Sequence, residues 1–169
     1  MSAGRPIARL AALLAMAWLV GLPVGAEEQR NMRLVGVDDL QARSAYQPVI
    51  HEQNGRFIAY VGHHGGKRLN PLTGQVEDNG TSIVDVTDPR RRRYLHHIPG
   101  AGGEGEAGGA AMVRVCDGKT LPRGAREKTY LLRTHGNLAH EIWDVTDPRR
   151  RRYLHHIPGA GGEGEAGGA

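Results

Sequence analysis

The sequence predicts an all-β protein made of antiparallel β-sheet repeats. Short segments rich in β-branched residues follow one another at roughly 8–14-residue spacing, which is typical of a sandwich, a barrel or a propeller. Helical periodicity is nearly absent beyond the N-terminal stretch, and two parts of the chain repeat one order of strands and turns. These observations therefore indicate a fold built from repeated antiparallel strands.

The N-terminus predicts a secretory signal peptide over residues 1–26. Two arginines give it a basic start, Leu10–Leu22 is an apolar run, and Val24–Ala26 has the small-x-small form of a cleavage site. The apolar run of about 13 residues is shorter than the ~20 that a spanning helix needs. We therefore expect a mature chain that starts at Glu27, is periplasmic or secreted, and has no membrane span.

The first strands are predicted as a hairpin that joins Pro48–Gln53 to Arg56–Gly62. Asn54 and Gly55 lie between them, and Asn-Gly is the preferred pair for a two-residue type I′ turn because both positions need a positive φ.

Further short strands are expected along the rest of the chain. They are Thr81–Thr87, Tyr94–Ile98, Met112–Cys116, Lys128–Thr134, Glu141–Thr146 and Tyr153–Ile157. Proline follows Thr81–Thr87 and Tyr94–Ile98, and proline cannot donate a hydrogen bond to a strand ladder. Cys116 is the only cysteine, so no internal disulfide is expected, and its alternating strand predicts a small apolar residue there.

The two halves share the order strand, loop, strand ending in Asp-Val-Thr-Asp-Pro, strand, Gly-rich loop. A unit of this kind cannot bury its own faces alone, so we expect neighbouring units to pack on each other. Asp85 and Asp144 each begin the shared turn. We expect their carboxylates to accept hydrogen bonds from turn amides rather than to act as acids.

Ile83–Pro89 and Ile142–Pro148 resemble the core motif of the LVIVD-repeat proteins. The wider run Asn31–Pro148, with its HHGG, LNPLTG and YLHHIPG segments, is similar to the N-terminal part of one branch of that family. The resemblance implies an exported bacterial protein of β-propeller type, and it implies no reaction. We therefore predict a propeller-like repeat region at residues 27–148 with about two blade-like units, fewer than the roughly 4–8 that close a propeller.

Asp85–Ala110 and Asp144–Ala169 are identical in sequence. Repeats normally diverge, so an identity that begins abruptly at the shared turn favours a recombination or assembly event over the alternative, a selected tandem repeat. Residues 149–169 are then a duplicated strand with a Gly-rich tail. Gly159–Ala169 lacks apolar groups to offset an ordering entropy of about 1–2 kcal/mol per residue, which predicts disorder, whereas Gly100–Ala110 is tethered by strands at both ends.

The segment Gly100–Gly105 has the spacing G-x-G-x-x-G after a strand. Dinucleotide binding at such a segment needs a following helix, whose N-terminus holds the pyrophosphate. No helix is expected after Gly105, so this segment is interpreted as a flexible loop and no cofactor is expected.

The chain has nine histidines, which raises the hypothesis of a metal site. His96-His97 and His155-His156 lie on predicted strands, where neighbours point to opposite faces, so we expect them on the sheet surface. Four others lie in loops that each follow the first strand of a unit, and these loops could share one end of the assembly. Imidazoles with Glu141 suit zinc or another divalent transition metal. The candidate ligands are His63, His64, His135 and His140; the alternative is a polar loop whose histidines only form hydrogen bonds.

Charge distribution and motif content argue against nucleic-acid binding and against a catalytic triad. The chain has 22 Lys and Arg against 18 Asp and Glu, and eight of the cations lie in two RRRR runs without interleaved aromatic residues. A nucleic-acid partner is therefore not expected. Chain order places no nucleophile near a base, so no catalytic triad is recognised.

The sequence thus predicts a non-enzymatic binding or scaffold module whose ligand is a protein or a small molecule. Open sheet edges further predict self-association. The alternative is a metal-dependent periplasmic enzyme that uses the loop histidines as ligands.

Overall fold

The computed structural model describes residues 31–159. The expected signal peptide at residues 1–26, and all of the expected Gly-rich tail beyond Gly159, lie outside these residues. All the strands lie within one unit, which begins at Val35. No helix in the described part of the chain is long and apolar enough to span a membrane.

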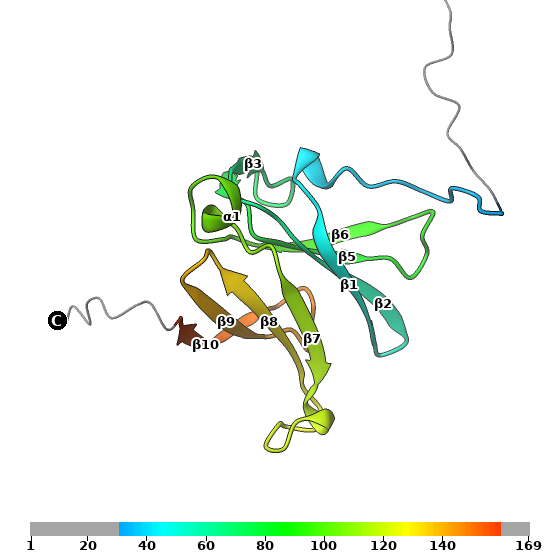
Figure 1. The fold of residues 1–169 in the computed structure, drawn as a ribbon. Coiled ribbons are helices and arrows are strands. Elements are labelled where there is room, and N and C mark those ends of the chain that lie inside the picture. The colour runs from blue at the N-terminus through cyan, green and yellow to red at the C-terminus, as the bar shows by residue number, and fades with distance from the viewer. Residues whose placement is uncertain (1–30, 160–169) are drawn as a thin grey trace, which may run out of the picture. The chain divides into compact units, whose positions relative to one another are not determined.

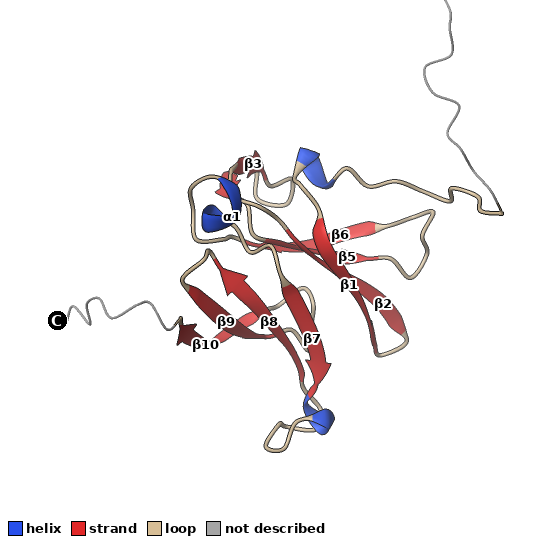
Figure 2. Cartoon of the chain, in the orientation of Figure 1, coloured by secondary structure: helices blue, strands red, loops and turns tan. Residues whose placement is uncertain are grey.

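The described residues form antiparallel sheets, which confirms the all-β prediction (Figures 1 and 2). The first sheet has the order β1-β2-β5-β6, with strands Tyr46–Gln53, Arg56–Gly62, Thr81–Asp85 and Arg93–Ile98. The second sheet has the order β10-β9-β8-β7, and in chain order β7 to β10 are Val113–Asp117, Thr129–His135, Ala139–Asp144 and Arg152–Pro158. Neither sheet of the described region closes on itself.

Smaller elements decorate the two sheets. A two-stranded hairpin between β2 and β5 is formed by β3 (Lys67–Leu69) and β4 (Val76–Asp78). Three single-turn helices lie in loops of the described region: η1 (Leu40–Ala42), α1 (Gly105–Gly108) and η2 (Gly118–Thr120). The sequence did not predict the hairpin, because strands of three residues are too short to show a hydrophobic period.

The predicted first hairpin is confirmed. Gln53 pairs with Arg56 across the turn, and Asn54 and Gly55 have φ values of 53° and 73°. Both turn residues therefore adopt the left-handed backbone that a type I′ turn requires.

The shared Asp-Val-Thr-Asp-Pro turn has the same structure in both sheets. Asp85 Oδ1 accepts hydrogen bonds from the amide and the hydroxyl of Thr87, at 3.1 and 2.6 Å. Asp144 Oδ1 does the same with Thr146, at 3.0 and 2.6 Å. These bonds end β5 and β9 at the aspartates, two residues before the predicted strand ends, and they confirm the structural role expected of both carboxylates.

The core lies between the two sheets. It joins Ile58, Tyr60, Ile83 and Ile98 of the first sheet to Val113 and Leu131 of the second, with Val145 beside them. We call the two faces that meet in this core the inner faces, and the opposite faces the outer faces. On the outer face of the first sheet, a second cluster places Leu40 of η1 over Ala59, Val61 and Val84.

The first Gly-rich segment is an ordered connection from β6 to β7. The amides of Gly65 and Gly66 donate to the carbonyl oxygens of Gly105 and Gly103, at 2.5 and 2.7 Å. A Cβ on Gly65 would lie 2.5 Å from the Gly103 oxygen, so the close approach requires glycine. The prediction that no helix follows Gly105 is wrong, because these bonds hold the segment in one turn, α1.

Candidate functional site

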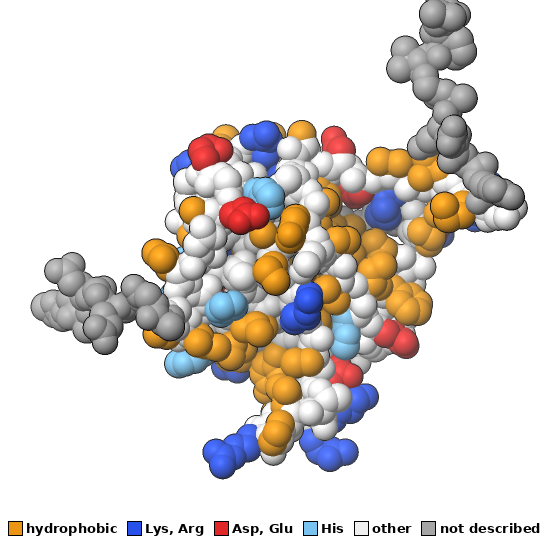
Figure 3. All heavy atoms as spheres, in the orientation of Figure 1, with side chains coloured by type: hydrophobic (Ala, Val, Ile, Leu, Met, Phe, Trp, Pro, Cys, Tyr) orange, Lys and Arg blue, Asp and Glu red, His pale blue; other side chains and the backbone are white. Residues whose placement is uncertain are grey.

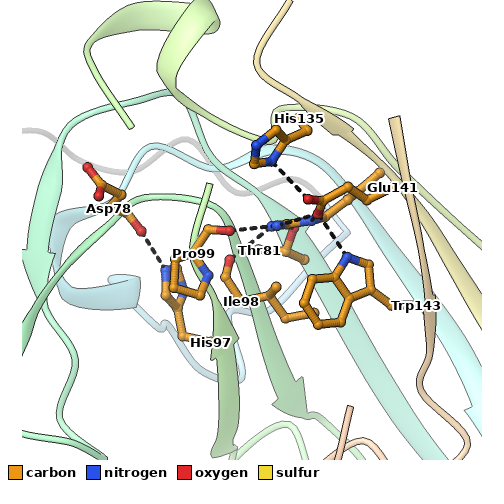
Figure 4. A network of polar contacts seen from close by, with 9 residues as sticks. Asp78, Thr81, His97, Ile98, Pro99, His135, Glu141 and Trp143 are labelled. Atoms are coloured by element: carbon orange, nitrogen blue, oxygen red, sulfur yellow. Dashed lines mark hydrogen bonds and ion pairs between the residues drawn. The ribbon is translucent and has the colours of Figure 1, made fainter. Parts of the chain in front are cut away.

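A buried arginine ties the two sheets together, and Figure 4 labels its partners Ile98, Pro99 and Glu141. Arg133 lies on the inner face of β8 and is 2% exposed. Its Nη1 donates to the Ile98 carbonyl oxygen at 3.0 Å, and its Nη2 donates to the Pro99 carbonyl oxygen at 2.6 Å. Its Nε and Nη2 also donate to Glu141 Oε2, at 2.9 and 2.7 Å. The guanidinium thus links the end of β6 to the second sheet.

Glu141 is the centre of this network. Trp143 Nε1 donates to Glu141 Oε2 at 2.9 Å, and the Arg133 guanidinium carbon lies 5.4 Å from the Trp143 ring centroid, within cation–π range. His135 Nδ1 lies 3.1 Å from Glu141 Oε1, an ion-pair distance without hydrogen-bond geometry. Burial opposes ionisation of Glu141, but the Arg133 charge and the Trp143 bond outweigh it, so the pKa of Glu141 lies below its usual range.

The network is built for cohesion between the sheets. The side chains of Arg133 and Glu141 are 1% and 9% exposed, so little of either charge reaches solvent. Sequence reasoning missed Arg133. Its signal was the position two residues after Leu131 in KTYLLRT, which puts both side chains on the same inward face of a strand.

The four candidate metal ligands occupy different environments. His63 is fully buried, and its ring nitrogens lie 2.5 Å from the Ser44 carbonyl oxygen and 2.7 Å from Ser82 Oγ. His64 packs its ring against that of Tyr46, with centroids 5.2 Å apart, while His135 faces Glu141 and His140 is exposed. Across residues 31–159 no three His, Cys, Asp or Glu side chains are grouped to hold a metal ion.

Ser82 and His63 form a serine–histidine contact that chain order did not reveal. The 2.7 Å between Ser82 Oγ and His63 Nε2 is within reach of a nucleophile and its base. Both residues are 0% exposed, however, and Ser82 Oγ also lies 3.2 Å from Tyr94 Oη. Burial lowers the pKa of His63 to about 4. The pair is therefore a satisfied core contact that no substrate reaches.

The expectation that His96-His97 lies on the sheet surface is wrong for His97. It is 1% exposed, its Nε2 lies 3.0 Å from the Asp78 carbonyl oxygen, and its ring centroid lies 6.2 Å from that of His63. Burial lowers the pKa of His97 to about 4. The reason is the β3–β4 hairpin, whose β4 covers this end of β6. His155 and His156 are exposed as predicted.

The outer face of the second sheet is an open apolar surface. Figure 3 shows hydrophobic side chains gathered over β7 and β8. A hollow of about 440 Å³ lies on this face. Its lining is Cys116, Leu121, Arg123, Gly124, Tyr130, Leu132, Ile142 and Ile157. Burial raises the pKa of the Cys116 thiol, which disfavours the reactive thiolate and agrees with the predicted apolar role.

Strand pairing shows what this hollow corresponds to in the first sheet. Ile58 pairs with Asp85, and Tyr130 pairs with Asp144, so the two sheets can be matched position by position from the shared aspartates. By this match, four residues of the second sheet occupy the positions of four core residues of the first sheet. The correspondence is Tyr130 to Ile58, Leu132 to Tyr60, Ile142 to Ile83 and Ile157 to Ile98. The four residues of the second sheet line the open hollow, and those of the first sheet are buried in the core.

Comparisons of the chain with protein-family models, with curated proteins and with solved structures found no match. The resemblance to LVIVD-repeat proteins therefore stays a prediction.

Proposed function

We propose that this chain is a non-enzymatic binding or scaffold module of β-propeller type, exported to the periplasm or beyond, and related to the LVIVD-repeat proteins. Its binding surface is the outer face of the second sheet. The observation that carries the proposal is the position match: the residues that dock one sheet on another in the core recur, uncovered, on this face.

The size and chemistry of the hollow support a binding role. A volume of about 440 Å³ falls in the range of roughly 300–1,000 Å³ that ligand pockets occupy. Leu132, Ile157 and Leu121 are 38%, 38% and 40% exposed, so a partner could remove apolar surface from water at each of them. Burial of such surface contributes about 25 cal/mol per Å².

The polar clusters favour a binding role over catalysis. The Ser82–His63 pair and the Arg133–Glu141 pair both lie in the interior, where each group already has a protein partner. The thiol that lines the hollow, Cys116, has a raised pKa. Hydrophobic contact is therefore the chemistry that this surface offers.

A dye-binding measurement tests the assignment of the surface. Leu132→Glu places a charge in the hollow, and we expect it to reduce binding of an anilinonaphthalene sulfonate dye about tenfold, since an uncompensated charge in an apolar site is costly. Leu69→Glu is the matched control, because Leu69 is exposed on the β3–β4 hairpin. Equal dye binding by both variants would show that the hollow is not the binding surface.

Metal loading separates the module from the enzyme alternative. We expect the purified protein to stay metal-free after incubation with zinc, copper and iron salts followed by desalting. Stoichiometric metal that is lost in the variant carrying both His135→Ala and His140→Ala would instead favour a metal-dependent enzyme.

A further inference from the structure

The contact between the two sheets joins unlike faces. The first sheet contributes the face that carries Ile58 and Tyr60, while the second contributes the face that carries Leu131 and Arg133. By the position match, Leu131 and Arg133 correspond to Ala59 and Val61, which lie on the outer face of the first sheet. One sheet therefore docks its Tyr60-type face on the opposite face of the next sheet.

Because each sheet uses a different face in this contact, the two faces left outside the core also differ: one is a Tyr60-type face and the other is of the opposite type. The second sheet ends in a Tyr60-type face, its outer face, with Leu132 and Ile157 uncovered. The first sheet ends in the opposite type, its outer face. Leu40 of η1 covers Ala59, Val61 and Val84 there, while Ile50 and Phe57 remain 63% and 48% exposed. Ile50 pairs with Ala59, which places it on this face.

The two end faces carry charges of opposite sign. On the outer face of the second sheet, Arg114 pairs across the ladder with Leu132, and Arg123 lines the hollow. On the outer face of the first sheet, Glu52 pairs across the ladder with Phe57. All three charged residues are exposed, and in the described part of the chain none of them forms an ion pair.

We propose that the outer face of the second sheet docks on the outer face of the first sheet of a second copy, so that chains stack head to tail. This inference rests on the proposed binding role of the same face. Leu132 and Ile157 of one copy and Ile50 and Phe57 of the next form the apolar centre of the contact. Arg114 of the first copy and Glu52 of the next lie at its rim. A face-to-face pairing of two second sheets is disfavoured, because it would bring arginines together.

A contact between unlike surfaces does not close on itself unless the rotation happens to form a ring. The stack therefore grows with protein concentration instead of stopping at a dimer. Rim charges chiefly affect the association rate and its salt dependence, so association weakens as salt screens Arg114 and Glu52.

Complementary blocking variants test the stack by sedimentation velocity over a concentration series. Leu132→Glu blocks one end and Ile50→Glu blocks the other, so each variant alone should be monomeric where the unmodified chain forms oligomers. An equimolar mixture should form a dimer, because one free end of each type remains. Dimers of Ile50→Glu alone would show that second sheets pair face to face, and they would overturn the proposal.

Charge reversal gives a second test at exposed sites that the fold tolerates. Arg114→Glu and Glu52→Arg should each weaken association at low salt by about tenfold, and a chain that carries both changes should recover it. Failure of the double variant to recover would contradict the contact. An unmodified chain that stays monomeric, yet loses dye binding on Leu132→Glu, would refute the stack and leave the binding surface intact. An unmodified chain that stays monomeric and whose dye binding Leu132→Glu does not reduce would refute both proposals.

Discussion

Strands β6 and β10 have the same sequence and different environments. Both read Arg-Tyr-Leu-His-His-Ile, and both occupy the same edge of a four-stranded sheet beside the same Asp-Val-Thr-Asp-Pro turn. In β6, His97 and Ile98 are each 1% exposed. In β10 all seven residues are exposed, and Ile157 is 38% exposed. Identical side chains are thus core in one sheet and surface in the other.

The difference comes from what the rest of the chain places over each strand. Leu131 and Arg133 cover the Ile98 side of β6, and the β4 carbonyl of Asp78 faces His97 on the other side. The described residues place no second sheet over Ile157. Local sequence therefore determines the strand and its turn, while burial depends on partners distant in the chain.

Removal of Arg133, which covers β6, should lower the free energy of unfolding the most. Arg133→Ala leaves the Glu141 carboxylate buried without its partner and frees two carbonyl oxygens of β6 and the residue after it. We expect a loss of about 3–5 kcal/mol in the free energy of unfolding, measured by urea denaturation. Arg114→Ala, an exposed arginine on the neighbouring strand, should change it by less than about 0.5 kcal/mol.

Replacing both Arg133 and Glu141 separates the cost of the unpaired carboxylate from the loss of the hydrogen bonds to Ile98 and Pro99. Arg133→Met combined with Glu141→Leu removes both charges and should recover most of the lost stability, because a buried ion pair is often replaceable by apolar side chains of similar volume. A double variant as unstable as Arg133→Ala would mean that the hydrogen bonds to Ile98 and Pro99, rather than the stranded carboxylate, are what the fold needs.

Acid should destabilise the fold through the buried His97 of β6. Burial lowers the pKa of His97 from 6.5 to about 4. The unfolded chain therefore takes up this proton first, and stability that is complete above pH 6.5 falls as the pH drops from 6.5 towards 4. At ~1.4 kcal/mol per pKa unit, the loss is about 3 kcal/mol for His97.

The duplicated strand supplies a control in an identical local sequence. His97→Gln should reduce the acid-dependent loss. Part of the remainder comes from His63, whose pKa is also lowered to about 4, and from His96, whose pKa burial lowers. His156→Gln changes the matching residue of β10, which is exposed, and serves as the control. Equal effects of the two substitutions would contradict the assigned burial.

Deletion of the second copy should have a small effect on stability. Residues Arg152–Pro158 pair only with β9 and expose every side chain. Removal of Arg149–Ala169 should therefore lower the free energy of unfolding by less than about 2 kcal/mol, below the scale of a buried structural element. A larger loss in urea denaturation would show that the second copy belongs to the stable fold.

The sequence predicted the local structure well. The first hairpin follows from Asn54-Gly55, and the shared turn follows from Asp85 and Asp144, because both depend on residues adjacent in the chain. The sequence also placed all the strands of the two sheets to within a few residues. β5 and β9 end early because their aspartates bond to the threonine two residues ahead.

The sequence could not predict which faces are covered. His97 was expected at the surface because neighbouring histidines on a strand point to opposite faces, and nothing in the identical local sequence distinguishes His97 from His156. Arg133 and the Ser82–His63 contact depend on pairings between residues far apart in the chain. The correspondence between the hollow and the core of the first sheet likewise appears only when the two sheets are matched through their hydrogen-bonded partners.

The most direct measurement compares one substitution at the two matched positions. Ile98→Ala removes a side chain that is 1% exposed, and Ile157→Ala removes the same side chain where it is 38% exposed. In urea denaturation of the monomeric protein, we expect Ile98→Ala to cost about 2–5 kcal/mol and Ile157→Ala to cost less than about 1 kcal/mol. Equal costs at the two positions would show that both faces are covered, and would contradict an open docking face on the second sheet.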